Sequence, residues 1–376
     1  MARSSLYSHL VKHGLPTTKA SGSALSGAVQ TFTLDNLPAG ADWTPESLLK
    51  QVGLNPGEWR ITNVKARGGH YGRPDDPSSQ IRLEISVVPL LPQGFKLPEP
   101  ADWKPLPKPK ARKKGKVHTT VVISDHHAPH EDRQFHKLFC AYLKEEQPDL
   151  IDVNGDLLDF ADISRHRPRD GYDDGVNETL QAGFNILRDY REACPDAHIR
   201  YSLGNHEARL EHMLIDNVRQ LHKIQAPEDD IPALSLRRLL HLDKLHVEYV
   251  EGDWDRVKKR IGRRVTSLHG YSTSKNPGAK ILTDLSGSTL QGHSHRLSLT
   301  YRTTHHHDDG VETRLAGEAG CACEIGDGLG YSNASVADWQ NGFLIVKTWP
   351  DDDFTVTPAI YLPGRLLIPD GRRYEA

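Results

Sequence analysis

Five short motifs rich in histidine and aspartate are the parts of this sequence best suited to chemistry. They are Asp125-His126-His127, Gly155-Asp156, Gly204-Asn205-His206-Glu207, His269 and Gly292-His293-Ser294-His295. Imidazole nitrogens and carboxylate or amide oxygens are donors that bind Mn²⁺, Fe²⁺, Zn²⁺ and Ni²⁺. Each motif follows an apolar stretch or lies within a few residues of one. This placement predicts a metal site at the carboxyl edge of a sheet, where loops converge.

The spacing within the motifs agrees with that prediction. Asp125 and His127 are two residues apart, as are His293 and His295, so both side chains of a pair can point the same way from an extended turn. The glycine of Gly155-Asp156 lets the backbone bend sharply, so the carboxylate that follows can bridge two cations. We therefore expect two neighbouring metal ions, each bound by nitrogen and oxygen donors.

The elements that must position these motifs can be predicted from periodicity. Strands are expected over 118–124, 150–153 and 199–203, and helices over 132–147, around 180–187 and over 209–220. Alternating strands and helices are typical of a parallel sheet with right-handed crossovers. After Val265 we expect a second, largely antiparallel sheet packed on the first. Its predicted strands cover 265–268, 288–291, 297–303, 311–316, 343–348 and 354–361.

Changes in composition divide the 376 residues into four parts. They are a flexible arm (1–30), a small α+β module (31–91), a basic linker rich in Pro and Lys (92–116) and a catalytic domain with a strand-rich C-terminal part (117–376). In the module, Thr44 is the expected N-cap of a short helix with Pro45 at its first position, and strands are expected over 59–64 and 81–88. The linker carries six prolines, and eight lysines or arginines against two acidic residues. It either contacts phosphates through residues 108–116 or is simply solvated.

Composition also excludes several classes of protein. The formal net charge of −3 argues against a histone-like nucleic-acid binder. Four irregularly spaced cysteines predict neither a disulfide framework nor a structural zinc site, which favours a cytoplasmic location. No run of about 18 apolar residues occurs, so neither a membrane span nor a signal peptide is expected.

In order and spacing, the five motifs resemble those of the calcineurin-like metallophosphoesterase superfamily, and the resemblance covers about residues 117–303. It implies an α/β fold, a four-layer α/β/β/α sandwich, with two divalent cations, of which Mn²⁺ is the first expectation and Fe²⁺, Zn²⁺ or Ni²⁺ are alternatives. Carried over by position, the ligands of one metal would be Asp125, His127, Asp156 and His295. Those of the other would be Asp156, Asn205, His269 and His293.

The resemblance also implies a reaction, in which a hydroxide that bridges the metals attacks phosphorus in line with the leaving oxygen. His206 would stabilise or protonate the leaving alkoxide, unless it is a helix-capping or core histidine. Asp159 and Glu207 would orient His206 or the ligand histidines. Arg209 and His166 are candidates to hold the substrate phosphate, although an exposed arginine on a helix is commonly just solvated.

The substrate is less well defined by the sequence, because the superfamily includes nucleases, cyclic-nucleotide diesterases, nucleotidases and protein phosphatases. The domain layout is similar to bacteriophage and bacterial members that are labelled DNA-repair exonucleases. Basic residues also precede His269, and with the basic linker they favour DNA as substrate and partner. These residues are Arg256, Lys258, Lys259, Arg260, Arg263 and Arg264.

We therefore expect a DNA nuclease of the exonuclease type that hydrolyses phosphodiester bonds. One alternative is a phosphomonoesterase that acts on nucleotides or phosphoprotein. Glu207 after His206 occurs in the phosphoprotein phosphatases, but their arginine after Gly-Asp is replaced here by Leu157. Another alternative is a non-catalytic DNA-binding or scaffold protein. The N-terminal module is a candidate surface for homo-oligomerisation or for a partner protein.

Three further features have simpler interpretations. His305-His306-His307 lies between two predicted strands and indicates a polar hairpin turn rather than a functional metal site. Cys321 and Cys323 share one face of any extended segment and are expected to be partly buried thiols. Trp339 is expected to fix a turn before the strand that begins at Phe343.

Overall fold

The structure is a computed structural model that describes residues 30–38, 44–56, 59–71, 80–89, 108–109, 116–165, 174–227, 229–307, 310–325 and 338–376. The chain divides into two compact units, one comprising Met1–Lys96 with Arg165–Arg167 and the other Leu97–Ser164 with Pro168–Ala376. Nearly all of the expected flexible arm and most of the expected basic linker lie outside the described residues. His166 lies outside them as well.

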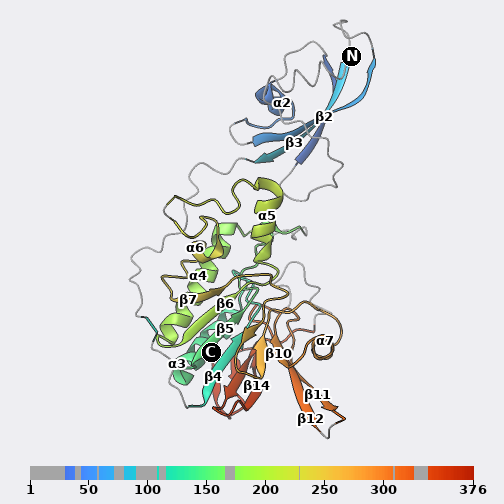
Figure 1. Ribbon diagram of the computed structural model, residues 1–376. Helices are drawn as coiled ribbons and strands as arrows, with labels where there is room; N and C mark the ends of the chain where they lie inside the picture. The colour runs from blue at the N-terminus through green and yellow to red at the C-terminus, as the bar shows by residue number, and fades with distance from the viewer. Residues whose placement is uncertain are drawn as a thin grey trace. The chain divides into compact units, whose positions relative to one another are not determined.

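The N-terminal unit contains a three-stranded antiparallel sheet and a short helix (Figure 1). The strand order is β1–β3–β2, with β1 at Gln30–Pro38, β2 at Trp59–Tyr71 and β3 at Gln80–Pro89. Helix α2 (Pro45–Gln51) has Thr44 as its N-cap, and the Thr44 side chain accepts a hydrogen bond from the Ser47 amide. Strand β1 was not predicted, and its first residue falls in the expected arm.

The larger sheet of the second unit has eight strands in the order β16–β15–β14–β13–β4–β5–β6–β7. Its parallel strands are β4 (His118–Ile123), β5 (Leu150–Asn154), β6 (His198–Ser202) and, at one edge, β7 (Val247–Val250). The sheet continues with antiparallel strands β13 (Gly342–Thr348), β14 (Phe354–Leu362), β15 (Arg365–Leu367) and β16 (Arg373–Glu375). The parallel part agrees with the predicted alternation of strands and helices.

The placement of β13 and β14 was predicted wrongly. Both were expected in the second sheet, but β13 pairs with β4, where Leu344 lies opposite Val122, and β14 pairs with β13. The apolar run in β13 is almost fully buried, as an interior strand requires. Periodicity identifies such a strand, but it does not identify the neighbour with which the strand pairs.

The second sheet has the order β11–β12–β10–β9–β8 and is mixed rather than largely antiparallel. Its strands are β8 (Lys259–Arg260), β9 (Val265–Ser267), β10 (Ser288–Gln291), β11 (Leu297–His305) and β12 (Val311–Ala319). Strand β10 pairs in parallel with both β9 and β12, whereas β11–β12 and β8–β9 are antiparallel. Between β11 and β12 the His306 amide donates to the Gly310 carbonyl, as a hairpin turn requires.

Helices cover the outer faces of the two sheets and complete an α/β/β/α sandwich (Figure 1). Helices α3 (Arg133–Glu146), α4 (Val176–Ala193) and α5 (Ala208–Val218) contribute apolar side chains to one core with the larger sheet, and α7 (Pro277–Asp284) packs on the second sheet. The short helices η1 (Ala161–Ile163) and α6 (Leu236–Leu239) lie in connections. A separate core joins the sheets face to face through side chains such as Val122, Leu290 and Leu344.

Candidate metal centre

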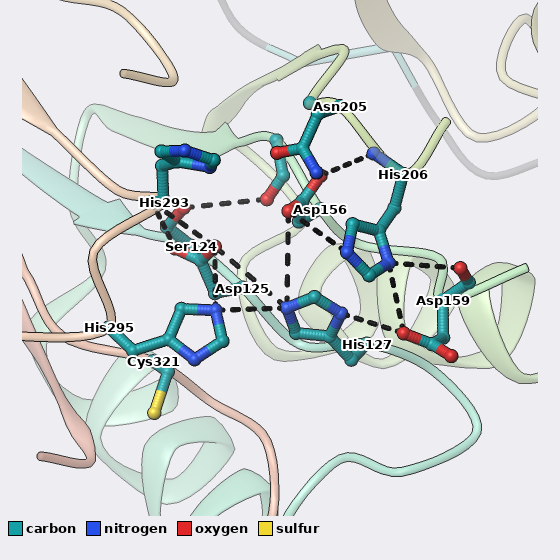
Figure 2. A network of polar contacts seen from close by, with 12 residues as sticks. Ser124, Asp125, His127, Asp156, Asp159, Asn205, His206, His293, His295 and Cys321 are labelled. Atoms are coloured by element: carbon teal, nitrogen blue, oxygen red, sulfur yellow. Dashed lines mark hydrogen bonds and ion pairs between the residues drawn. The ribbon is translucent and has the colours of Figure 1, made fainter. Parts of the chain in front are cut away.

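Every expected metal ligand lies just beyond the carboxyl end of a strand. Asp125 and His127 follow β4, Asp156 follows β5 and Asn205 follows β6, while His269 follows β9 and the pair His293 and His295 follows β10. Loops from both sheets therefore meet at one edge of the sandwich, and Figure 2 shows the side chains of Asp156, His127 and His295 pointing toward one another.

One group of donors gathers around His127 and His295. Their Nε2 atoms are 3.1 Å apart, and Nε2 of His295 lies 3.3 Å from Oδ1 of Asp125. Oδ2 of Asp156 lies 4.0 Å from Nε2 of His127. All four residues are buried. Two ring nitrogens and two carboxylates directed at one point form a donor set that suits a divalent cation.

A second group shares Asp156 with the first. Nε2 of His269 lies 3.3 Å from Oδ2 of Asp156 and 3.1 Å from Oδ1 of Asn205. His293 completes this group, since its donor atom lies within 4.8 Å of those of Asp156 and His269. The structure thus brings together all seven residues expected to bind metal, in two groups with one carboxylate in common.

The backbone at these ligands is held in a conformation that L-residues rarely adopt. The φ angles are 57° at Asp125, 50° at His127, 49° at Asp156, 64° at His293 and 58° at His295. Each such residue costs about 1–3 kcal/mol, and strained residues of this kind gather at functional sites. The strained backbone orients these side chains toward the centre of the site, and the donor set that results suits two divalent cations.

Two glycines are required because backbone approaches the ligands closely. A Cβ atom on Gly204 would lie 2.1 Å from Oδ1 of Asp156, and one on Gly292 would lie 2.6 Å from Oδ2 of Asp125. Both contacts are far shorter than van der Waals distance. The glycines of these two motifs therefore provide space for the carboxylates rather than only flexibility.

At four of the ligands the surroundings favour the ionisation state that binds metal, whereas at His269 the charge of Asp156 outweighs burial and raises the pKa to about 9, which favours the protonated ring. Burial opposes ionisation of Asp125, yet His295 lowers the pKa of this carboxyl to about 2. For Asp156 burial is likewise outweighed, and His269 and His206 hold the pKa well below its usual value. Burial lowers the pKa of His127 and of His293 to about 4, which favours neutral rings. Carboxylates and neutral imidazoles are the forms that coordinate a cation.

Asp159 links a ligand to the expected leaving-group histidine. Its Oδ1 lies 3.0 Å from Nδ1 of His127 and 2.9 Å from Nδ1 of His206. Arg209 donates from Nη1 to the backbone carbonyl of Asp159 at 2.7 Å, and its Nη2 lies 2.9 Å from Nε2 of His206. His206 also donates its backbone amide to Oδ1 of Asp156 at 2.9 Å. Asp159, His206 and Arg209 thus form one connected group beside the ligands (Figure 2 shows the first two).

The prediction that Glu207 orients His206 or a ligand histidine does not match its hydrogen bonds. Its carboxylate accepts from the backbone amides of Asp156 at 3.0 Å, Leu158 at 2.9 Å and Gly204 at 2.7 Å. Burial, followed by the charge of Asp156, raises the pKa of Glu207. This residue therefore ties the loop after β5 to the loop after β6.

Two tryptophans beside the ligands were not recognised as site residues from the sequence. The centroid of the Trp254 ring lies 5.9 Å from the centroid of the His269 ring and 5.7 Å from that of the His293 ring. Trp339, expected only to fix a turn, lies 4.2 Å from the ring of His295. Both side chains are half-buried. Neither belongs to a motif, so the sequence contains no signal that would have assigned them to the site.

The basic run before His269 is less available to a polyanion than expected. Lys259 is buried and lies 3.2 Å from Oδ1 of Asp152. Arg263 pairs with Asp352 at 3.0 Å, and Arg264 pairs with Asp353 at 3.3 Å. The prediction of a local positive patch is therefore wrong for Lys259, which is buried against Asp152, whereas Arg263 and Arg264 remain exposed beside acidic residues.

The sandwich fold, with its His/Asp cluster at the strand ends, defines a metal-dependent hydrolase of phosphoesters. Residues 118–309 match the family described as Calcineurin-like phosphoesterase, and the chain belongs to this family. In the described part of the chain, none of the helices combines the length and apolar character needed to cross a membrane.

Similar proteins include two from mycobacterial phages. The Gene 54 proteins of Mycobacterium phage L5 and Mycobacterium phage D29 are each 23% identical over 269 residues, which is 68% of this chain and 98% of the phage protein. Vacuolar Protein Sorting 29 from Cryptosporidium parvum is 12% identical with a TM-score of 0.34, and the match covers 69% of this chain and 99% of that one. A purple acid phosphatase from yellow lupin seeds is 10% identical with a TM-score of 0.35, covering 94% of this chain and 70% of that one.

Proposed function

We propose that the protein is a nuclease that hydrolyses phosphodiester bonds in DNA. The observation that carries this proposal is the presence of Trp254 and Trp339 beside ligands of both metal groups. Aromatic faces bind unpaired bases by stacking, with about 1–3 kcal/mol per base. Unpaired bases would find stacking partners beside the metal ligands, so the position of the two tryptophans supports a nucleic acid as the substrate.

In this proposal the ligands have the roles that their grouping suggests. Asp125, His127, Asp156 and His295 hold one divalent cation, and the other is held by Asp156 together with Asn205, His269 and His293. Two cations, proposed to be Mn²⁺, supply a nucleophile at neutral pH and neutralise the charge on the phosphate. The protein's own contribution is to fix the donors with strained backbone and close glycines.

His206 and Arg209 act on the substrate in this proposal. Asp159 holds Nδ1 of His206 at 2.9 Å, so Nε2 would serve the leaving oxygen once the Arg209 guanidinium turns from this atom to the substrate. The Arg209 guanidinium lies next to that atom, at 2.9 Å, where it can bind a non-bridging phosphate oxygen when substrate enters. Asp159 is a positioning residue here, because it acts through His206 and His127.

The test is hydrolysis by the full-length protein of single-stranded DNA, double-stranded DNA, a chromogenic phosphodiester and a chromogenic phosphomonoester. We expect cleavage of the diesters with Mn²⁺, no cleavage with a chelator, and a loss of kcat of about 10²-fold to 10⁴-fold in His206→Ala. If no diester is cleaved with any of the four metals, or if the monoester is the better substrate, the nuclease proposal is wrong.

The tryptophans are tested separately. Trp254→Ala should raise the KM for a single-stranded oligonucleotide by about 5-fold to 150-fold, the equivalent of about 1–3 kcal/mol, and should affect the chromogenic diester less. Trp349→Ala is the matched control, because Trp349 is exposed on the turn after β13, which lies at the opposite end of β4 from the ligands. Equal effects of Trp254→Ala on both substrates would remove the argument for base stacking.

A further inference from the structure

A separate group of metal-binding side chains lies behind His295. Its donor atoms, from His295, Cys321 and Cys323, lie within 4.8 Å of one another, and all three residues are buried. Figure 2 shows the Cys321 side chain beside the His295 ring. The Nε2 atom of this ring already faces Asp125 at 3.3 Å and His127 at 3.1 Å, so Nδ1 is the nitrogen left for the sulfurs.

Nδ1 of His295 differs from the same atom in two other ligand histidines. Nδ1 of His127 meets Asp159 at 3.0 Å, and Nδ1 of His269 meets the Asn154 carbonyl at 2.8 Å. Among the described residues, Nδ1 of His295 has no hydrogen-bond partner, although the residue is only 5% exposed. A buried polar atom without a partner costs about 1–3 kcal/mol. Such an atom, directed at two thiols, indicates that something else satisfies it.

The two thiols are held in place by their backbone. The Asn341 side-chain amide donates to the carbonyl of Cys321 at 3.2 Å and to that of Cys323 at 2.7 Å. Both cysteines also form isolated β-bridges, Cys321 with Asn341 and Cys323 with Glu131. Trp339 packs against both cysteines and the His295 ring, and so shields the group. This arrangement is prepared before any ligand arrives, as a binding site requires.

We propose that Nδ1 of His295 and the sulfurs of Cys321 and Cys323 form a third metal site, selective for a thiophilic divalent cation such as Zn²⁺ or Cd²⁺. Thiolate and imidazole are preferred ligands of these ions, whereas Mn²⁺ prefers oxygen donors. Binding forms two metal–sulfur bonds and one metal–nitrogen bond, and it releases the two thiol protons to solvent. If Nε2 of His295 binds a cation at the same time, the ring also releases its remaining proton and bridges the two ions.

The site is independent of the substrate, so it can be tested without measuring hydrolysis. Metal-free, full-length protein is titrated with Co²⁺ under reducing conditions, because a cobalt–thiolate bond gives an intense near-ultraviolet charge-transfer absorption that nitrogen and oxygen ligands do not give. We expect this absorption in the wild-type protein and its loss in Cys321→Ser and in Cys323→Ser. Cys194→Ser is the matched control and should keep the absorption, since Cys194 is buried in the core beside the larger sheet and belongs to none of the metal-binding groups among the described residues.

Several outcomes overturn the proposal. One is the absence of the absorption in wild-type protein, and another is its persistence in the Cys321→Ser, Cys323→Ser double variant. If the serine variants fail to fold, the ¹¹³Cd resonances of the loaded wild-type protein decide. A resonance shifted downfield by two thiolates supports the third site, and resonances typical of nitrogen and oxygen ligands alone contradict it.

Discussion

Two buried carboxylates, four residues apart, have different kinds of charged partners in this fold. Asp152 on β5 accepts from Nε of Arg200 at 3.0 Å, lies 3.2 Å from Nζ of Lys259 and also accepts from the Ser267 hydroxyl. Asp156, just beyond the same strand, forms its ion pairs only with histidines in the described part of the chain. One carboxylate is balanced by a lysine and an arginine, and the other is paired with histidines.

The difference in charged partners distinguishes a structural group around Asp152 from a metal-binding group around Asp156. Lys259 also donates to Asn154 and to Ser202, both at 2.6 Å, and Arg200 donates to the Arg260 carbonyl at 3.0 Å, so the Asp152 group joins β5 and β6 to β8 of the second sheet. It needs nothing from outside the protein. Histidines, by contrast, carry protons that a metal ion can replace. The Asp156 group is therefore the one prepared to exchange its positive charge for external cations.

The largest effect is expected at the carboxylate shared by both metal groups. Asp156→Asn removes a charged ligand from both cations, and the lost charge stabilisation of several kcal/mol corresponds to a fall in kcat of about a thousandfold or more. Hydrolysis of a chromogenic phosphodiester with saturating Mn²⁺ measures it. A fall of less than tenfold would show that Asp156 is not the shared ligand.

The matching change in the structural group should act on stability. Asp152→Asn leaves Arg200 and Lys259 buried without their carboxylate, which costs about 3–5 kcal/mol in the free energy of unfolding. Urea unfolding of the metal-free protein measures this cost. The variant should still bind Mn²⁺, and if it loses metal binding while remaining as stable as wild type, the two groups are not separable.

Addition of metal should also distinguish the two groups, through a smaller change in the stability of the folded state. A cation at one hundred times its dissociation constant stabilises the folded state by about 2.7 kcal/mol per site. We expect Mn²⁺ to raise the midpoint of thermal unfolding in wild-type protein and in Asp152→Asn, but much less in Asp156→Asn. Equal shifts in all three proteins would place the bound Mn²⁺ elsewhere.

The smallest effect is the acid dependence of the structural group. Burial opposes ionisation, but Lys259 and Arg200 lower the pKa of Asp152 from 3.8 to about 2. Because this folded-state pKa lies below the unfolded one, the contribution of Asp152 is complete above pH 3.8 and is lost as the pH falls toward 2. The difference in the free energy of unfolding between wild type and Asp152→Asn should therefore narrow over this range. Urea unfolding at several pH values measures it, and a constant difference would contradict the ion pairs.

Local patterns account for what the sequence could predict. The strands from β4 to β6 have clear apolar periodicity, and the ligand motifs lie directly beyond strand ends, so the parallel core and the meeting of the seven ligands followed from short segments. Such local patterns do not predict which segments distant in sequence contact one another. The contact of β13 with β4, the pairing of Arg263 with Asp352 and the approach of Trp254 to His269 each join segments with no common sequence signal.

The hydrogen bonds of Glu207 have a consequence for the choice of ion. Three backbone amides from the loops after β5 and β6 converge on this one carboxylate, so the two loops cannot shift independently. The position of Asp156 relative to Asn205 is then set by the main chain. An ion whose radius did not suit these fixed loops would lose a ligand rather than move a loop, so the contacts of Glu207 would favour ions of one size.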